Sequence, residues 1–256
     1  MLRSRIIPAL LLHQEDLVKT VKFSEHKYIG DPINTVRIFN EKQVDELIVL
    51  DISASESNLE PNYSLIEKIA SECRMPLCYG GGIRTVEHAS NIIKLGVEKV
   101  ALGTILHHNP QIISKIANVI GNQSIVGIID IKKSIFGKYH LYSNRGKIKS
   151  NLSLFKYIKD LENFGVGEIL INSIDLDGTM LGYDLEFIER VRACIGVPLT
   201  VMGGASSKQD IINLIKKFEI IGAAAGSLFV FKGPYKAVLI SYFSDTEKES
   251  IFHNSI

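Results

Sequence analysis

Two matching stretches, MPLCYGGGIRT at residues 75–85 and VPLTVMGGASS at residues 197–207, decide the fold of this chain. Each runs from a short apolar segment into consecutive glycines, and their starts at 75 and 197 are 122 positions apart. The stretches VDELIVLDISA at 44–54 and VGEILINSIDL at 166–176 show the same offset. Matching segments at one fixed spacing indicate an internal duplication.

A third pair of matching segments extends the repeat towards the end of each copy. VALGTIL at 100–106 corresponds to AAAGSLF at 223–229, with starts 123 positions apart. We therefore expect the whole 256-residue chain to form one domain made of two duplicated halves, at about 1–121 and 122–243. The remaining tail, 244–256, is polar, and we expect it to be poorly ordered.

Short apolar runs recur through both halves without polar alternation, which is typical of buried parallel strands. Longer amphipathic patterns that predict helices lie between them, for example at 86–95, 185–193 and 208–218. An α/β chain with eight such runs in 256 residues has the size and rhythm of a single (β/α)8 TIM barrel. A doubly wound open sheet shows the same alternation, but a two-fold repeat of four units each favours closure. The eight runs span 5–12, 46–52, 77–79, 99–102, 124–130, 168–172, 199–202 and 220–224.

Composition and charge exclude several classes of protein. Apolar residues make up 46% and charged residues 22% of the chain, and the net charge is +1. These values exclude a disordered chain, a collagen-like repeat and a disulfide framework, and they give no global reason to expect a nucleic-acid or membrane partner. The three cysteines are unpatterned and the seven histidines are scattered. We therefore expect a cytoplasmic, reducing compartment, no metal site and no cofactor.

Glycines and small hydroxyl residues follow four of the predicted strands. Glycines let backbone N–H groups approach an anion, a following helix N-terminus adds positive potential, and Thr or Ser adds a hydroxyl. Turn geometry alone explains any one pair, but pairs at matched offsets favour two phosphate-sized sites, which suit a ligand with a phosphate at each end. The four places are Gly80 to Gly82, Gly103 and Thr104, Gly203 and Gly204, and Gly226 and Ser227.

Carboxylates also occur at strand ends, where a barrel carries its chemistry. Asp130 ends the fifth run and Asp177 follows the sixth, so both are candidate general acids or bases. An alternative role for Asp175 is to cap the next turn. Asp51 also ends an apolar run and could be either an acid or base group or a cap. The repeat places the counterpart of Asp130 at the end of the first strand, where Leu11 and its leucine neighbours cannot transfer protons.

Four charged residues lie at or beside strand starts, at the opposite end of the predicted barrel. They could form a ring of salt bridges around the barrel axis. One interpretation is a stabilising charge layer at the bottom face, and the other is a gate over a channel that runs up the axis. The residues are Arg5, Glu46, Lys99 and Glu168.

These segments together resemble the cyclase subunit of imidazole glycerol phosphate synthase, the HisF family, over almost the whole chain. RIIPALL at 5–11, GGGIRT at 80–85 and AAAGSLF at 223–229 match, and SIDLDGTMLGYD at 173–184 follows the specific pattern SIDxDGTxxGYD. The resemblance implies a duplicated (β/α)8 barrel in a lyase-type glutamine amidotransferase complex. In that family a HisH-like glutaminase docks under the barrel, and ammonia travels up the axis to a bisphosphate substrate.

The resemblance also implies roles for individual residues. The four strand-start charges correspond to the family's ammonia gate, and Glu98, beside Lys99, is expected at the glutaminase interface. A usual Asn of the phosphate site is replaced by Gly103. The phosphate-binding positions correspond to Gly82, Thr104, Gly178, Gly204 and Ser227, and we add Gly103, Gly226 and Lys19 to them.

The departure from the family lies in its chemistry. The family uses one Asp at the end of strand one and one at the end of strand five; the second is Asp130 here, but the first is Leu11. The loop at 17–32 keeps Lys19 but lacks the usual Asp-Gly-Arg entry. This combination looks like the paralogous branch associated with glycosyl amidation. There the barrel and a glutaminase deliver ammonia to a third protein, which amidates a sugar for surface polysaccharide of the O-antigen type in lipopolysaccharide biosynthesis.

The same residues allow two other interpretations. The first is a working cyclase of histidine biosynthesis, in which Asp130 performs most proton transfers and Asp177 or Asp51 covers for the missing group. The second is the sister isomerase, which shares the duplication and the phosphate sites. It has no tunnel charges and needs both aspartates, so it fits less well.

The stretch 132–149 holds six Lys or Arg and no acidic residue. It follows the fifth predicted strand, so we expect a hairpin over the barrel mouth. Both an anion-binding role and a solvated face are consistent with its charge.

Overall fold

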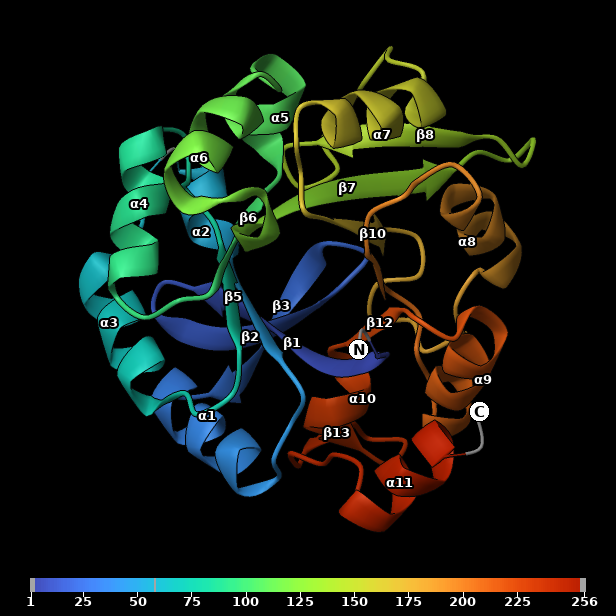
Figure 1. The fold of residues 1–256 in the computed structure, drawn as a ribbon. Helices are drawn as coiled ribbons and strands as arrows, with labels where there is room; N and C mark the ends of the chain where they lie inside the picture. The colour runs from blue at the N-terminus through green and yellow to red at the C-terminus, as the bar shows by residue number, and fades with distance from the viewer. Residues whose placement is uncertain (1–2, 58, 254–256) are drawn as a thin grey trace.

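A closed barrel of eight parallel strands forms the centre of the computed structural model, which describes residues 3–57 and 59–253 (Figure 1). Each barrel strand pairs with the next, and β12 pairs again with β1, so the barrel itself has no free edge. The predicted (β/α)8 barrel is confirmed, and the open-sheet alternative is wrong. The strands in barrel order are β1 (Arg5–His13), β4 (Leu47–Asp51), β5 (Leu77–Gly80), β6 (Lys99–Leu102), β7 (Ile125–Lys133), β10 (Glu168–Ser173), β11 (Leu199–Met202) and β12 (Gly222–Ala225).

Amphipathic helices cover the outside of the barrel (Figure 1). The expected helices at 86–95, 185–193 and 208–218 appear within a residue of their predicted ends, and Thr85, Asp184 and Ser207 cap their first turns. The longer helices are α1 (Pro32–Glu41), α3 (Tyr63–Glu72), α4 (Val86–Lys94), α6 (Ile112–Ile120), α7 (Leu154–Asn163), α8 (Leu185–Arg192) and α9 (Lys208–Phe218). Short helices are α2 (Ile52–Glu56), α5 (Thr104–His108), η1 (Asn122–Ser124) and α10 (Ser227–Val230).

The end of the described chain folds into a docked helix, α11 (Asp245–His253). Its Ile251 is buried, its Glu247 receives Lys208 Nζ at 2.6 Å, and its Lys248 Nζ donates to the carbonyl of Gln43 at 2.8 Å. The expectation of a poorly ordered tail is therefore wrong for 245–253, because apolar contacts of Ile251 and Phe252 and two tethers fix a mainly polar helix. Residues 254–256 of that predicted tail lie outside the described residues.

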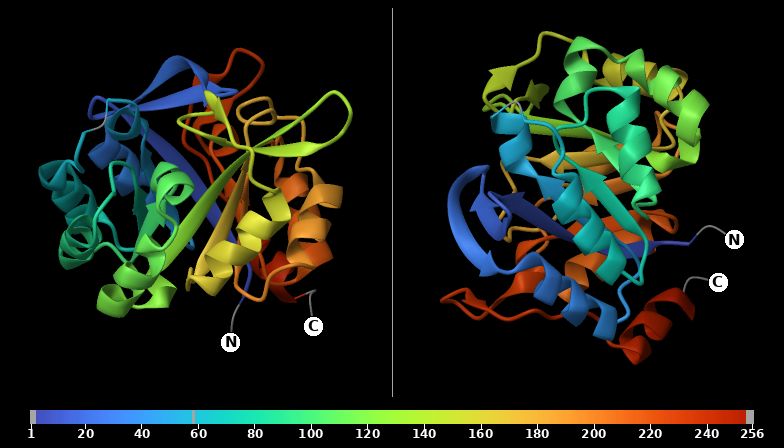
Figure 2. Two further views of the ribbon diagram at one scale, coloured as in Figure 1. Left: turned by 90° about the horizontal axis from the view of Figure 1, so that it is seen from above. Right: turned by 90° about the vertical axis from the view of Figure 1, so that its left-hand side faces the viewer.

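Three hairpins project from the side of the barrel where the strands end. Figure 2 shows them, in blue, yellow-green and red, on the side opposite both chain termini. The basic stretch 132–149 forms the second of them, as predicted. The hairpins are β2 (Asp16–Val21) with β3 (Ser24–Gly30), β7 with β8 (Tyr139–Ser143) and β9 (Ile148–Lys149), and β13 (Phe231–Lys232) with β14 (Ala237–Val238).

The barrel interior is a separate apolar layer between the strand starts and the strand ends. In β1, Ile7 and Ala9 face this layer, whereas Ile6 and Leu10 belong to the core under the helices, as the period of two requires. Residue 121 lies between α6 and η1, so each expected half carries four barrel strands. The inner layer contains Ile7, Ala9, Ile48, Cys78, Ala101, Val126, Leu170, Met202 and Ala224.

Candidate functional site

A cavity of about 320 Å³ opens at the carboxyl ends of the barrel strands. Such a mouth is where barrel enzymes bind their ligands. The predicted phosphate-binding residues line this one cavity together with Leu11, Asp130 and Asp177, although they come from all parts of the chain, whereas Asp175 does not line it. The residues of this set that line the cavity are Leu11, Lys19, Gly82, Gly103, Thr104, Asp130, Asp177, Gly178, Gly204, Gly226 and Ser227.

Close approach of the backbone explains Gly204, and one neighbouring hydroxyl points to a ligand. A Cβ on Gly204, which has φ +109°, would lie 2.0 Å from the carbonyl oxygen of Gly182. Close approach alone therefore requires this glycine. Among the described residues, the Ser227 Oγ is buried in the cavity wall without a hydrogen-bond partner. Because buried hydroxyls are normally paired, this atom fits a ligand oxygen such as that of a phosphate.

Asp130 combines burial with a position at the cavity. Its Oδ1 accepts a hydrogen bond of 3.0 Å from Asn172 Nδ2. Burial raises the pKa of Asp130 to about 7, the bond from Asn172 opposes this, and the charge of Asp177 adds to it. A carboxyl group with a pKa near neutrality can both donate and accept a proton, which suits it to general acid and base work.

Asn172 is a site residue that sequence reasoning missed. It lies on the cavity wall next to Asp130 in the neighbouring strand, because β7 and β10 pair Asp130 with Asn172. Its Oδ1 is buried without a hydrogen-bond partner within the described chain. The available signal was a polar side chain at the end of the otherwise apolar run 168–172.

Asp130 imposes a pH-dependent cost on stability. Its pKa is about 7 in the folded state against an ordinary 3.8. The unfolded chain therefore ionises first, and stability falls as the pH rises from about 4 to about 7. We expect Asp130→Asn to raise the free energy of unfolding by about 2–4 kcal/mol at pH 8 and by little at pH 4. Urea unfolding at both pH values measures this, and an equal gain at each would mean that ionisation is not the cause.

Leu11 lies on the wall of the same cavity as Asp130 and is half-buried. It follows Ile7 and Ala9 with the strand period of two, so it faces the barrel axis. Leu11 is the position at which the repeat predicts a counterpart of Asp130. Its side chain points into the cavity but cannot transfer a proton.

Asp177 holds a hairpin in place. Its carboxylate accepts hydrogen bonds from Lys19 Nζ at 2.6 Å, Thr20 Oγ1 at 2.8 Å and the backbone N–H of Phe23 at 3.4 Å. Its backbone carbonyl accepts from Lys22 N at 2.9 Å. The β2–β3 hairpin is therefore tied over the mouth, and both Asp177 and Lys19 are engaged with each other.

The other two strand-end carboxylates also have structural partners. Asp51 Oδ1 accepts from the backbone N–H groups of Ser53 and Ala54, each at 3.0 Å, so it is the N-cap of α2. Asp175 Oδ2 accepts from the backbone N–H of Lys133 at 2.7 Å. The capping expected of Asp175 is replaced by a tie to β7.

Gly178 provides a direct test of the tied hairpin. It has φ +68°, and a Cβ would lie 2.2 Å from the Thr20 carbonyl oxygen. We expect Gly178→Ala to push the β2–β3 hairpin off the mouth, lower the free energy of unfolding by about 1–3 kcal/mol and speed tryptic cleavage near Lys22. Gly182→Ala is the matched control, because Gly182 has φ +93° but no atom within 4 Å of a Cβ. Equal effects of both variants would show that backbone strain, and not the clash, is responsible.

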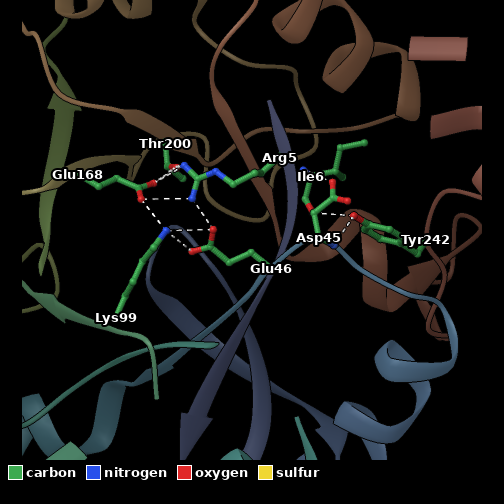
Figure 3. Close-up of polar contacts among 8 residues, drawn as sticks. All are labelled: Arg5, Ile6, Asp45, Glu46, Lys99, Glu168, Thr200 and Tyr242. Atoms are coloured by element: carbon green, nitrogen blue, oxygen red, sulfur yellow. Dashed lines mark hydrogen bonds and ion pairs between the residues drawn. The ribbon is translucent and has the colours of Figure 1, made fainter. Parts of the chain in front are cut away.

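The four strand-start charges close into a ring across the barrel floor (Figure 3). Arg5 pairs with Glu46, and its Nη2 lies 2.8 Å from Glu168 Oε1. Lys99 Nζ completes the ring at 2.9 Å from Glu46 and 2.8 Å from Glu168. Thr200 from β11 also donates its hydroxyl to Glu168. Sequence reasoning missed Thr200, although it is a lone polar residue within the apolar run 199–202.

Three members of the ring stay charged over a wide pH range. Burial opposes the charged forms of Arg5, Lys99 and Glu168, but the opposite charges around them outweigh it. The pKa of Glu168 is lowered to about 2 by Arg5 and Lys99, and the pKa values of Arg5 and Lys99 are raised by Glu168 and Glu46. Glu98 is exposed beside Lys99, on the same floor.

The described residues lack both a metal cluster and a helix that could span a membrane. In residues 3–57 and 59–253, no group of three or more His, Cys, Asp or Glu side chains is placed to hold a metal ion. No helix in this part of the chain has both the length and the apolar character needed to cross a bilayer.

Comparison with known proteins gives consistent matches over nearly the whole chain. The family model described as "Histidine biosynthesis protein" matches residues 5–235. A Vibrio vulnificus (strain YJ016) protein named "Putative imidazole glycerol phosphate synthase subunit hisF3" is 55% identical over 250 residues, covering 97% of this chain and 96% of the relative. A Leptospira borgpetersenii protein named "Putative imidazole glycerol phosphate synthase subunit HisF" is 52% identical over 253 residues, covering 98% and 100%. An Alkaliphilus metalliredigens (strain QYMF) protein named "Imidazole glycerol phosphate synthase subunit HisF" is 37% identical over 229 residues, covering 90% and 91%.

Proposed function

The chain belongs to the histidine biosynthesis protein family and, within it, to the HisF group of imidazole glycerol phosphate synthase subunits, and we propose that it conducts ammonia to a separate acceptor protein instead of closing an imidazole ring. One observation carries the proposal. The floor ring is complete, whereas Leu11 occupies the place at the mouth where the HisF resemblance implies an aspartate.

The pattern of identities supports membership in a separate branch. The two relatives with names qualified as "Putative" are 55% and 52% identical to this chain, whereas the Alkaliphilus subunit with an unqualified name is 37% identical. All three match nearly full length. This chain therefore groups with the relatives whose names carry the qualifier.

The floor is the proposed entry for ammonia. A HisH-like glutaminase docks there in a heterodimer and contacts the exposed Glu98, which lies next to the ring residue Lys99. Ammonia passes when one ion pair of the ring opens. Above the ring, the small side chains of Ala9, Ala101 and Ala224 belong to the apolar inner layer. This layer favours neutral ammonia over ammonium, because an unpaired charge is costly to bury.

The mouth is the proposed exit. With Leu11 on its wall and Asp177 engaged by Lys19, Asp130 is left as the acid or base group with a pKa near neutrality. The acceptor is a third protein that amidates a sugar in surface-polysaccharide synthesis. The mouth also binds a phosphorylated small molecule through the loops that contain Gly204 and Ser227.

Genuine cyclase activity is the second candidate, and one observation favours it. Asp130 keeps the burial and the pKa of about 7 that suit proton transfer. The engagement of Asp177 with the hairpin and of Asp51 with α2 speaks against either one covering for the missing carboxylate. The complex would then be the lyase-type synthase itself.

Transfer of isotopic nitrogen tests the proposed delivery. The chain, its glutaminase and the sugar-amidating protein of the same source are combined with glutamine labelled at its amide nitrogen. We expect the label in the amidated sugar even when unlabelled ammonium is present in excess, because channelled ammonia does not mix with the solvent. Label that equilibrates completely with the added ammonium would contradict conduction through the barrel.

A further inference from the structure

The mouth side carries the most exposed large apolar side chains of the described residues. Contiguous exposed apolar surface commonly marks an interaction site. All four of these side chains lie on segments that follow the carboxyl ends of barrel strands β7, β10 and β12. They are Ile135 (95% exposed), Tyr235 (92%), Phe136 (90%) and Leu181 (78%).

The same side carries a local excess of positive charge. Residues 132–149 hold six Lys or Arg and residues 231–238 hold two, and neither stretch has an Asp or Glu, in a chain whose net charge is only +1. Lys138 and Lys149 are exposed, Lys138 being two residues from Phe136. Apolar tips flanked by like charges are typical of a docking surface that selects an oppositely charged partner.

The β2–β3 hairpin joins the two basic stretches into one surface, which we call the basic rim (132–149 and 231–238). On one side, Arg145 Nη2 donates to the Phe23 carbonyl at 3.4 Å and lies 2.8 Å from His26 Nε2. On the other, Lys27 Nζ donates to the Lys236 carbonyl at 2.7 Å. Figure 2 shows the three hairpins on the same side of the barrel. The basic rim therefore lies on the mouth side of the barrel, with Arg145 on the cavity wall, and away from the floor ring.

We propose that the basic rim docks the acidic surface of the protein that receives the ammonia, with Phe136 inserted into an apolar depression of that surface. The inference rests on the proposed function and adds the face and the partner chemistry to it. Ammonia that reaches water at neutral pH becomes ammonium, which has no lone pair with which to attack a carbon atom. An acceptor protein must therefore cover the mouth, whereas an anionic membrane would attract the same charges without receiving the ammonia.

Two rim variants and one matched control test the docking. Lys138→Glu/Lys149→Glu reverses two rim charges, and Phe136→Ser removes one apolar tip. Lys68→Glu/Lys115→Glu reverses two exposed charges on α3 and α6, outside the rim. Calorimetry measures binding of the sugar-amidating protein to the heterodimer of each variant with the glutaminase. We expect each rim variant to bind about tenfold or more weakly and the control to bind as the unaltered chain does.

Several results would overturn the proposal: no binding of the sugar-amidating protein to the unaltered heterodimer, unchanged binding by both rim variants, or equal weakening by the control. If the rim variants lost binding to vesicles of phosphatidylcholine and phosphatidylglycerol but still bound the sugar-amidating protein, the rim would be a membrane-binding surface instead. Labelled-nitrogen transfer separates this proposal from the proposed function. If the unaltered complex delivers label and the rim variants deliver it equally well, only the docking fails. If the unaltered complex delivers none, the proposed function itself fails.

Discussion

Replacing Leu11 by aspartate is expected to raise the rate of imidazole ring formation from ammonium and the histidine-pathway bisphosphate by a factor of about 10² to 10⁴. Leu11 faces the mouth cavity that also contains Asp130 and Ser227. A carboxylate there would restore the pair of acid and base groups that the family chemistry uses, in a mouth whose other predicted residues are in place. Product formation with ammonium salt, without glutamine or glutaminase, measures the gain.

Leu11→Asn is the control for this gain, because the asparagine side chain has nearly the shape of aspartate but cannot transfer a proton. We expect it to leave the low rate unchanged. If Leu11→Asn raised the rate as much as Leu11→Asp, polarity and not proton transfer would be the missing element. If Leu11→Asp folded with normal stability and gave no gain, other differences in the mouth, such as the tied β2–β3 hairpin, would be responsible.

Removing Glu168 is expected to open the floor and to destabilise the barrel. Glu168 pairs with both Arg5 and Lys99 and is nearly fully buried, so Glu168→Ala leaves two cations around a single carboxylate. Loss of one partner in a buried ion-pair network typically costs about 3–5 kcal/mol. We expect a loss of this size at pH 7. We also expect ammonia from the glutaminase to appear in the solvent instead of at the mouth.

The loss of unfolding free energy depends on pH, and it is larger for a buried ion pair than for an exposed one. The pKa of Glu168 is lowered from its ordinary 4.5 to about 2. Its stabilisation is therefore present above pH 4.5, and it is lost as the pH falls towards 2. Glu189→Ala breaks the exposed pair with Lys217 on the outer helices and is expected to cost less than about 1 kcal/mol. If Glu168→Ala folded stably, formed the heterodimer and transferred ammonia without leakage, the gate interpretation would be wrong.

The barrel fold and the residues that line its mouth could be predicted because both follow from local sequence patterns. The apolar runs marked all eight barrel strands, and closure brought residues as distant as Leu11 and Ser227 to one cavity. The charged strand starts predicted a ring, since inward-pointing side chains at the same level of a barrel meet at its axis. Only the three-dimensional structure shows which side chains at the mouth and in the floor ring bind one another.

The roles of individual carboxylates could not be read from the sequence. Asp51, Asp130 and Asp177 all follow apolar runs, yet one caps a helix, one lies partly buried beside an amide, and one binds a lysine. Burial and hydrogen-bond partners separate them, and both depend on contacts between distant segments. The docked helix α11 was missed for the same reason, because its stability comes from tertiary contacts and not from its own polar sequence.

The turnover of the histidine-pathway bisphosphate by the unaltered chain with saturating ammonium tests the central claim most directly. Because ammonium bypasses the glutaminase and the floor ring, this rate reports only on the chemistry at the mouth. A barrel that conducts ammonia but lacks one of two acid and base groups is expected to turn over at least about 100-fold more slowly than a cyclase with both. A rate equal to that of such a cyclase would contradict the account and identify the chain as a working synthase subunit.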